Sequence, residues 1–401
     1  MQPRRSWRRK PLAPVHPISH SRIGGMGRDL NSAAWSPGEA NANTTFRGEP
    51  LPKEWRWELG PIERVYLVGA GASVHYGLPT LKTLTWELVE SLDQADRNIL
   101  LTAIRESFPG TELTSMNQTV DYEELLNRLN PDALAYLELA GVSPLDSPRR
   151  RAALLALQGL HDFVLDRCKS VAHQIGPFDT LVKAVDSRSV IVSFNWDVLL
   201  ELAVLRAGRE YSYLPPGLKE NGVLLLKPHG SINWFALLDR ELLSVDKRSN
   251  LWVIGPNIGS YMCYKRSPLD PVDFSKTTVE YCLSRTPAIV PPSATRALDV
   301  GGVPRDGFVA HGHDLTMQAT WLTVAQAIGR SRQLVVIGYS LPGTDGATIE
   351  LLKFFSRRAA TRREILIVDP DPAVIERYRV ILDVEVSHVG ADFADFDPTT
   401  L

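Results

Sequence analysis

Short apolar segments alternate with helical patterns along most of this chain. Five of these segments have the length and the content of β-formers that are typical of buried strands, and glycine or a polar residue follows each one directly. They span residues 65–68, 189–194, 223–226, 334–337 and 364–368, and a weaker segment spans 384–389. Because strands that alternate with helices form parallel sheets, the pattern predicts an α/β protein with a doubly wound parallel sheet.

Helical patterns connect these segments, and one helical region is longer than a crossover needs. The connecting helices are expected over residues 81–92, 198–205, 316–330 and 346–358. The longer region runs from 121 to 174, where Glu123 and Glu124 stand in a first helical turn and suit the helix dipole. Residues 233–288 mix aromatic and charged residues without a clear period, which favours an inserted subdomain or cap.

The first 55 residues differ in character from the rest of the chain. They are polar, strongly basic up to Lys10, and without a helical or strand period, which predicts a disordered basic tail. This stretch has two alternative interpretations. One is an arm that binds nucleic acid or a partner, and the other is that translation starts at Met26. Residues 56–401 are expected to form one folded unit.

Composition and charge narrow the class of protein. The 44% hydrophobic and 22% charged residues are ordinary for a soluble globular protein, and a net charge of −2 gives no general attraction to nucleic acid. Three cysteines without Cys-x-x-Cys spacing cannot complete a four-cysteine zinc site. No apolar run reaches the roughly 18 residues of a membrane span. We therefore expect a cytoplasmic protein with no metal, no membrane association and no direct nucleic-acid binding.

The first apolar segment runs into a glycine-rich turn, Gly69-Ala70-Gly71-Ala72-Ser73, and a helical pattern begins at Leu81. Glycine lets the backbone approach a ligand closely, and the N–H groups of a helix start can bind phosphate. The turn therefore favours a site for a nucleotide pyrophosphate. The spacing is not Gly-x-Gly-x-x-Gly, because Val74 stands where a third glycine would be, so a purely structural tight turn is the alternative.

Polar residues also end the later segments. Asn195 and Asp197 follow the second segment, His229 follows the third, and Asp369 follows the fifth. Open α/β sheets bind ligands at the carboxyl ends of their strands, so these side chains are candidates for one site. His229 is a candidate acid or base, although a histidine in a loop is more often only solvated.

Taken together and in this order, the motifs resemble the sirtuin fold, and specifically the bacterial sirtuin-like NAD hydrolases of antiphage defence. The resemblance extends from about residue 65 to 371, roughly three quarters of the chain. The matching motifs are Gly69-Ala70-Gly71-Ala72-Ser73, Gly77-Leu78-Pro79, Asn195-Trp196-Asp197, His229-Gly230 and Ile337-Gly338-Tyr339-Ser340-Leu341-Pro342 with Asp345.

The resemblance implies a role for each matching residue, with NAD as the substrate and no metal. The pyrophosphate would be held by the glycine loop and the segment after it, through Gly69, Ala70, Gly71, Ser73 and Thr80. Asn195 would orient the nicotinamide ribose or the attacking water, Asp197 would hold the carboxamide, and His229 would be the base. Gly338 and Ser340 would contact phosphate or the adenosine ribose, and Asp369 would accept from that ribose.

The departures from the family pattern bear on the substrate. Protein deacylases of this fold carry a four-cysteine zinc ribbon, which this chain lacks, and Asp-Phe-Arg where this chain has Thr80-Leu81-Lys82. Phe194 also replaces the glutamine that precedes the family's asparagine. Because the peptide-binding half is altered while the NAD half is kept, the resemblance favours hydrolysis of NAD over lysine deacylation.

The leading hypothesis is therefore an NAD glycohydrolase that releases nicotinamide and ADP-ribose, acting as a regulated antiphage effector that depletes NAD. The resemblance implies a homo-oligomer, with a neighbour-encoded hexameric translocase-type ATPase or an Argonaute-like protein as sensor. The alternatives are an NAD-dependent deacylase or ADP-ribosyltransferase, and a non-catalytic sensor of NAD or ADP-ribose. A dehydrogenase comes last because the glycine spacing is wrong for it.

Overall fold

The computed structural model describes most of the chain after residue 58. The described residues are 59–111, 113, 120–129, 148–215, 218–237, 251–254, 261–265, 267–270, 283–289, 311–343, 345–357, 364–382 and 386–401. The expected tail, residues 1–55, lies outside them, and the domain boundaries stay predictions.

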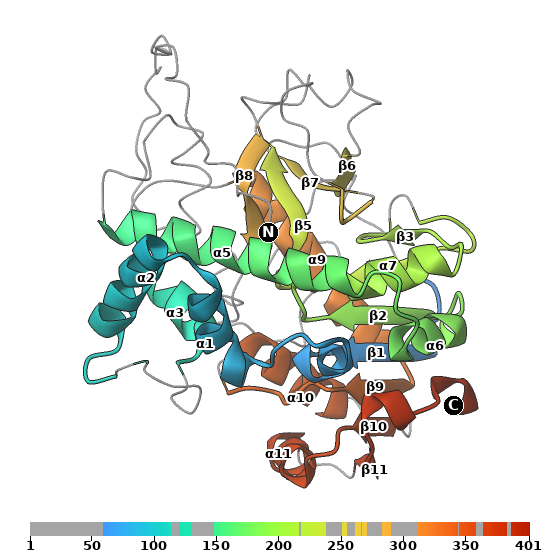
Figure 1. Ribbon diagram of the computed structural model, residues 1–401. Helices are drawn as coiled ribbons and strands as arrows, with labels where there is room; N and C mark the ends of the chain where they lie inside the picture. The colour runs from blue at the N-terminus through green and yellow to red at the C-terminus, as the bar shows by residue number, and fades with distance from the viewer. Residues whose placement is uncertain are drawn as a thin grey trace, which may run out of the picture. The chain divides into compact units, whose positions relative to one another are not determined.

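A seven-stranded parallel sheet forms the centre of the described fold (Figure 1). Its order is β11–β10–β9–β1–β2–β4–β3, and every neighbouring pair is parallel. The strands are β1 (Arg64–Val68), β2 (Ser189–Ser193), β3 (Tyr211–Ser212), β4 (Val223–Leu226), β9 (Gln333–Ile337), β10 (Glu364–Val368) and β11 (Ser387–Val389). The strand order reverses direction at β1, so the expected doubly wound parallel sheet is confirmed.

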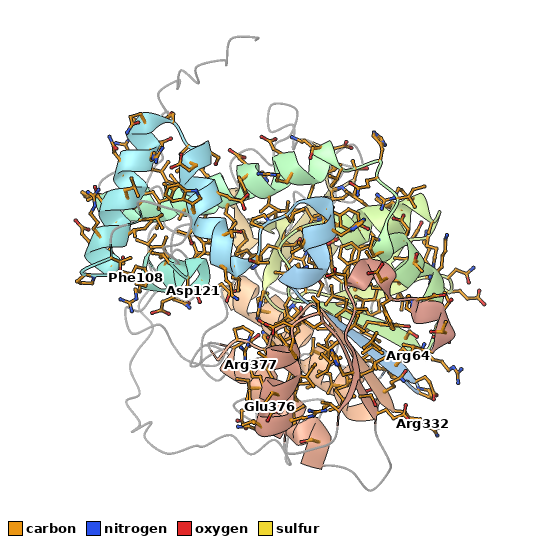
Figure 2. All side chains as sticks on the ribbon, turned by 60° about the horizontal axis from the view of Figure 1, so that its bottom comes forward. Arg64, Phe108, Asp121, Arg332, Glu376 and Arg377 are labelled. Carbon is orange, nitrogen blue, oxygen red and sulfur yellow. The ribbon has the colours of Figure 1, made fainter. Side chains whose placement is uncertain are left out.

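The apolar content of the central strands explains why they could be predicted from the sequence. Residues 65–68 of β1 are buried, and so is every residue of β2 and β4. Parallel strands are covered by helices on both faces, so their sequences are continuous apolar runs. Arg64 and Arg332, at the amino ends of β1 and β9, mark the edge of the sheet opposite to the polar strand ends (Figure 2).

Nine α-helices surround the sheet in the described part of the chain. They are α1 (Leu81–Ser91), α2 (Gln94–Ser107), α3 (Tyr122–Leu129), α5 (Pro148–Ser170), α6 (Pro177–Ala184), α7 (Leu199–Arg206), α9 (His311–Arg330), α10 (Gly346–Arg357) and α11 (Pro372–Leu382). A 3₁₀ segment, η2 (Ala70–Tyr76), stands between β1 and α1, and two more, η8 (Phe393–Asp395) and η9 (Pro398–Thr400), end the chain. Helix α9 begins five residues before the start expected at 316 (316 − 311 = 5).

The expected helical region at 121–174 contains α3 and α5, and residues 130–147 between them lie outside the described part. Both helices pack with α1 and α2, which makes a helical group beside the sheet. Figure 1 shows α5 running from α2 and α3 toward the second sheet of the molecule. Asp121 caps α3, because its Oδ1 accepts from the N–H groups of Glu123 (2.9 Å) and Glu124 (3.2 Å).

The second sheet is antiparallel, with the order β6–β7–β5–β8. Its strands are β5 (Gly230–Leu237), β6 (Leu251–Ile254), β7 (Tyr261–Lys265) and β8 (Leu283–Ile289). These strands lie in or next to residues 233–288, for which the lack of a clear hydrophobic period favours an inserted subdomain or cap. Strand β5 starts one residue after His229, so this sheet is joined directly to a strand end of the parallel sheet.

No helix within the described ranges is both long enough and apolar enough to cross a bilayer.

Candidate functional site

The carboxyl ends of β1, β2, β4, β9 and β10 meet at one pocket of about 380 Å³, a volume ordinary for a small-molecule site. Ten of the eleven residues expected at the site line this pocket: Ala70, Gly71, Ser73, Thr80, Asn195, Asp197, His229, Gly338, Ser340 and Asp369. The eleventh, Gly69, packs its backbone against Tyr339 next to the pocket. The sheet topology therefore brings together expected site residues that are as much as 299 positions apart (369 − 70 = 299).

The loop after β1 crosses the loop after β9 in close backbone contact, and this contact explains the glycines. Gly338 has a φ of 57°, and a Cβ added there would lie 2.3 Å from Ala72 N. A Cβ on Gly69 would lie 2.6 Å from Tyr339 Cα. The N–H of Gly71 donates to Gly338 O (2.9 Å), and that of Ala72 to Gly69 O (3.0 Å). The glycines thus permit two loops to cross, and these two N–H groups are used within the protein.

Asn195 is held in a fixed orientation by two hydrogen bonds. Its Nδ2 donates to Gly69 O (3.0 Å) and to Ser73 Oγ (2.9 Å), and Ser73 Oγ in turn donates to Asp197 Oδ2 (2.7 Å). A backbone carbonyl can only accept, so the side facing Gly69 must be the NH₂ group. Because both amide hydrogens are used, Asn195 offers its oxygen Oδ1, an uncharged acceptor, to the pocket.

His229 is buried at the pocket wall beside a carboxylate. Its Nε2 lies 3.4 Å from Asp345 Oδ2, and neither ring nitrogen has a hydrogen-bond partner of good geometry among the described residues. Burial lowers the pKa of His229 below its usual 6.5, although the charge of Asp345 and the backbone of Phe194 act in the opposite direction. The imidazole is therefore neutral near pH 7 and able to accept a proton.

Asp345 is anchored from several sides. The Tyr339 hydroxyl donates to its Oδ2, and Thr348 donates through its Oγ1 to Oδ2 (2.8 Å) and through its N–H to Oδ1 (3.2 Å). The carboxylate thereby caps the start of α10 while facing His229. Leu341, earlier in the same loop, has a φ of 51°, and an L-residue there costs on the order of 1 kcal/mol or more.

An aromatic cluster borders the histidine. The ring of Phe194 stacks on that of Tyr339, with centroids 4.3 Å apart and planes at 16°, and lies 5.1 Å from the imidazole of His229. Trp321 of α9 lies 6.0 Å from the imidazole on another side. These rings exclude water from His229, and this is the physical source of its lowered pKa.

A buried ion pair supports the Asn195–Asp197 segment from behind. Lys227, which is 1% exposed, contacts Glu201 Oε1 at 3.0 Å and donates to Ser231 Oγ at 2.8 Å and to the backbone carbonyl of Asp197. Tyr213 also donates to Glu201 Oε1 (2.7 Å). The charge of Lys227 is therefore matched, and the backbone that carries Asp197 is fixed in place.

The other end of the pocket is acidic. Asp369, Asp371 and Asp392 all line it, and burial raises the pKa of Asp369 above its usual 3.8. Arg377 of α11, labelled in Figure 2, donates to the backbone carbonyl of Ser340 and so fixes the loop above this end. Lys82 lines the pocket at the first turn of α1, where the helix start adds positive potential.

Two buried acids were missed or misread in the sequence, and of these Glu123 lines the pocket whereas Asp345 lies behind His229. Glu123 was interpreted as a charge at a helix start, whereas it is 6% exposed and lines the pocket. Asp345 was matched to a family motif but given no role. The helical spacing gave no signal for Glu123, because it groups with Glu124, Asn127 and Arg128 on the polar face of α3.

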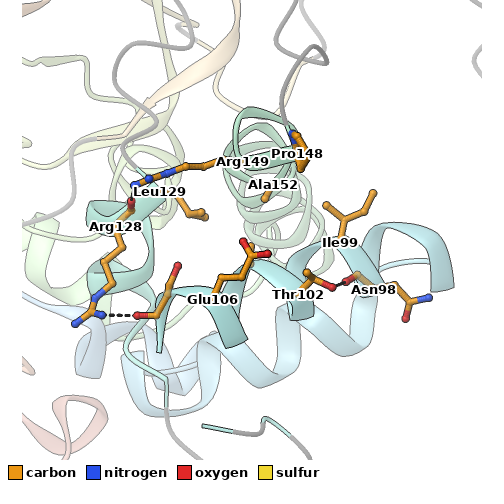
Figure 3. A pocket seen from close by; sticks show the side chains of 11 residues that line it. Asn98, Ile99, Thr102, Glu106, Arg128, Leu129, Pro148, Arg149 and Ala152 are labelled. Carbon is orange, nitrogen blue, oxygen red and sulfur yellow. Dashed lines mark hydrogen bonds between the residues drawn. The ribbon is translucent and has the colours of Figure 1, made fainter. Parts of the chain in front are cut away.

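A second cavity, of about 610 Å³, lies among α2, α3 and α5, and Figure 3 shows it from close by. Its charged side chains are Glu106, Arg128 and Arg149, and Arg128 donates to the backbone carbonyl of Ser107 at its edge. None of the site residues expected from the sequence lines it. The chemistry is thus gathered in the pocket at the strand ends.

The described part of the chain contains no group of three or more His, Cys, Asp or Glu side chains arranged to hold a metal ion.

No protein-family model matches the sequence, and no curated protein matches it. Solved structures of Sir2 proteins are similar to it. A mutant Sir2 homologue in complex with 2′-O-acetyl ADP ribose is 14% identical, with 84% of this chain and 89% of that chain covered and a TM-score of 0.37. Sir2 bound to an acetylated peptide is 15% identical over 84% and 90% (TM-score 0.30), and Sir2 with a p53 peptide and NAD⁺ is 13% identical over 84% and 90% (TM-score 0.28). At these values the similarity concerns only the course of the chain and carries no conclusion about function.

Proposed function

We propose that this protein is an NAD glycohydrolase, which cleaves the bond between nicotinamide and ribose and releases nicotinamide and ADP-ribose. The observation that carries the proposal is the pairing, in one pocket, of a fixed amide oxygen on Asn195 with a buried, neutral histidine, His229. Both groups stand at carboxyl ends of neighbouring strands, which is where doubly wound sheets bind nucleotides.

The residues suit the bond to be broken. When the bond between the ribose C1′ and the pyridinium nitrogen breaks, its electron pair moves to that nitrogen, so neutral nicotinamide leaves and positive charge develops on the ribose. The oxygen of Asn195 is a preorganised dipole for that charge, and it forms no salt bridge with the substrate beforehand. Water then adds to C1′ and loses one proton, which His229 accepts. The products are nicotinamide, ADP-ribose and a proton.

The remainder of the pocket suits a dinucleotide. Lys82 and the first turn of α1 provide positive potential for the pyrophosphate, beside the crossing glycine loops. Asp369 and its acidic neighbours Asp371 and Asp392 suit the hydroxyls of the adenosine ribose, since carboxylates accept hydrogen bonds from a ribose diol. Asp197, whose two carboxylate oxygens accept from Ser73 and Leu199, retains lone pairs for the carboxamide.

We further propose, on the motif resemblance alone, that the enzyme is a regulated antiphage effector that depletes NAD. A toxic activity of this kind requires restraint at rest. A homo-oligomer, and a neighbour-encoded translocase-type ATPase or Argonaute-like protein as sensor, are the proposed sources of that control.

The test is release of nicotinamide from NAD by the purified full-length protein, with no peptide present. Asn195→Ala and His229→Ala are each expected to slow release on the order of 10² to 10⁴-fold, because each removes one preorganised catalytic group. Ile175→Ala, at a position 78% exposed, is the control and is expected to match the unaltered protein. Release that persists in both site variants would refute the site, and tight NAD binding without release would favour the sensor alternative.

A further inference from the structure

Glu123 is a buried carboxyl that the chemistry proposed above does not use. It is the second residue of α3, lines the pocket and is 6% exposed, and its Oε2 has no hydrogen-bond partner within the described part of the chain. The start of its helix is fixed, because Tyr122 donates to Ala156 O (2.7 Å) and Asp121 accepts from the N–H of Glu123 itself (2.9 Å). Glu123 is therefore held in the pocket wall by its backbone.

The surroundings of Glu123 do not stabilise its charge. The charged groups that act on it most are Asp121 and Asp345, which are both acidic, and together with burial they raise the pKa of Glu123 well above its usual 4.5. A buried carboxyl oxygen without a hydrogen-bond partner costs stability, and a side chain placed only for packing would serve better as an apolar residue. Such a cost is typical of a residue kept for a ligand.

The position of Glu123 indicates which part of a ligand it meets. It lies near enough to Asp345 to feel its charge, and Asp345 lies 3.4 Å from His229. Glu123 thus shares the pocket wall with His229 and lies within electrostatic reach of the carboxylate that faces that histidine. A carboxyl at that place would face the ribose that becomes positively charged.

We propose that Glu123 binds a hydroxyl of the nicotinamide-side ribose and stabilises the positive charge that develops on that ribose as the bond breaks. This inference rests on the proposed function. In glycoside cleavage generally, hydrogen bonds to a sugar hydroxyl near the reacting carbon strengthen in the transition state, and a nearby carboxylate stabilises the cation. The ribosyl cation would also supply an opposite charge to a carboxyl whose charged neighbours, Asp121 and Asp345, are both acidic.

Two substitutions separate the hydrogen bond from the charge. Glu123→Gln keeps a group that can hydrogen-bond but has no charge, whereas Glu123→Met fills a similar volume and removes both. Glu124→Gln is the matched control, because Glu124 is the next residue on the same helix and pairs with Arg128 (2.8 Å) outside the pocket.

The experiment measures binding of NAD and of its 2′-deoxy and 3′-deoxy analogues at the nicotinamide ribose, by calorimetry on the full-length protein. Removing the contacted hydroxyl is expected to weaken binding to the unaltered protein and to Glu124→Gln by about tenfold, in line with the loss of one hydrogen bond to a charged group. For Glu123→Met, the dissociation constants of that analogue and of NAD should agree within about twofold, because the carboxyl that contacts the hydroxyl is already absent. The proposal is overturned if Glu123→Met still binds the deoxy analogues as much more weakly than NAD as the unaltered protein does.

Nicotinamide release by the same variants tests the charge. Glu123→Gln is expected to bind NAD within about threefold of the unaltered protein and to release nicotinamide at least tenfold more slowly, as for an interaction made mainly in the transition state. An unchanged rate would refute the electrostatic role. An unaltered protein that binds NAD without turnover would refute the hydrolase, while the binding comparison would still decide whether Glu123 contacts the ribose. If the unaltered protein does not bind NAD, both proposals fall.

Discussion

His229 Nε2 lies 3.4 Å from Asp345 Oδ2, and both side chains are almost completely buried where the ends of β4 and the loop before α10 meet. A neutral imidazole that accepts a proton becomes positively charged, and the adjacent carboxylate stabilises that charge and limits how the ring can turn. Asp345 is thus a positioning residue for the proposed base.

Replacing Asp345 with asparagine should therefore lower kcat for nicotinamide release by on the order of 10², with little change in NAD affinity. The amide can still accept from Thr348 N–H, so the start of α10 keeps its cap. Thr348→Val removes a hydroxyl partner of Asp345 without removing the carboxylate, and it should reduce kcat by less than about tenfold. Equal losses in the two variants would show that Asp345 acts only through the stability of the loop.

The pH dependence of release provides a second check. His229 must be neutral to accept a proton, and burial lowers its pKa below 6.5, so its protonation reduces the rate only at pH values below 6.5. Glu123, whose pKa is raised above 4.5, adds a second loss of rate on the acid side if its ionised form is the active one. Glu123→Gln removes that second group. Its pH–rate profile should therefore be flat from pH 7 to 8 and should fall with a single midpoint below 6.5.

A midpoint above 6.5 in Glu123→Gln would contradict the placement of His229 in a water-poor wall. Asp345→Asn should shift the midpoint still lower, because the charge that favours the protonated imidazole is lost.

Gly338 should tolerate no side chain. Alanine there would place its Cβ 2.3 Å from Ala72 N at a φ of 57°, so the two crossing loops must separate or strain. We expect Gly338→Ala to lower the free energy of unfolding by roughly 2 kcal/mol or more and to weaken NAD binding, as measured by urea unfolding and calorimetry. Gly60→Ala, where no atom lies within 4 Å of the added Cβ, is the control and should change neither quantity noticeably.

The buried pair of Lys227 and Glu201 should show strong coupling. Lys227→Met leaves the Glu201 carboxylate buried without its cation and is expected to cost about 3–5 kcal/mol in urea unfolding. Adding Glu201→Leu removes the unpaired charge and should recover a large part of that loss. If the losses of unfolding free energy from Lys227→Met and Glu201→Leu simply add, the two side chains do not stabilise the fold as a pair.

The acidic end of the pocket should select NAD over NADP. A 2′-phosphate on the adenosine ribose would approach Asp369, Asp371 and Asp392, and these like charges would repel it. We expect kcat/KM for NADP to be at least tenfold lower than for NAD. The double variant Asp369→Asn with Asp392→Asn should reduce that ratio, and a ratio near one in the unaltered protein would contradict the assigned orientation of the dinucleotide.

The central sheet was largely predictable, and the reason is physical. Buried parallel strands are continuous apolar runs, so β4 and β10 were expected at their observed bounds and β2 to within one residue. The antiparallel strands β5 to β8 were not predicted, because their sequences mix aromatic and charged residues without a clear alternation.

The site was predictable to the extent that it stands at strand ends. Asn195 and His229 were expected there because carboxyl ends of parallel strands share one edge. Glu123 was not, since acids in a first helical turn are usually solvated and only the packing of α3 turns this one inward. The glycines were expected to approach a ligand, whereas Gly71 and Gly338 are required where two loops cross, a contact between distant segments that periodicity cannot reveal.

Hydrolysis of NAD without a second substrate can be tested by the molar balance of its products. The purified protein would be incubated with NAD alone and with NAD plus an acyl-lysine peptide, and nicotinamide, ADP-ribose and acylated ADP-ribose would be quantified. We predict one ADP-ribose for each nicotinamide in both mixtures, at the same rate and with the peptide unchanged. Nicotinamide that appears only with the peptide, together with deacylated peptide and acylated ADP-ribose, would show a deacylase and not a hydrolase.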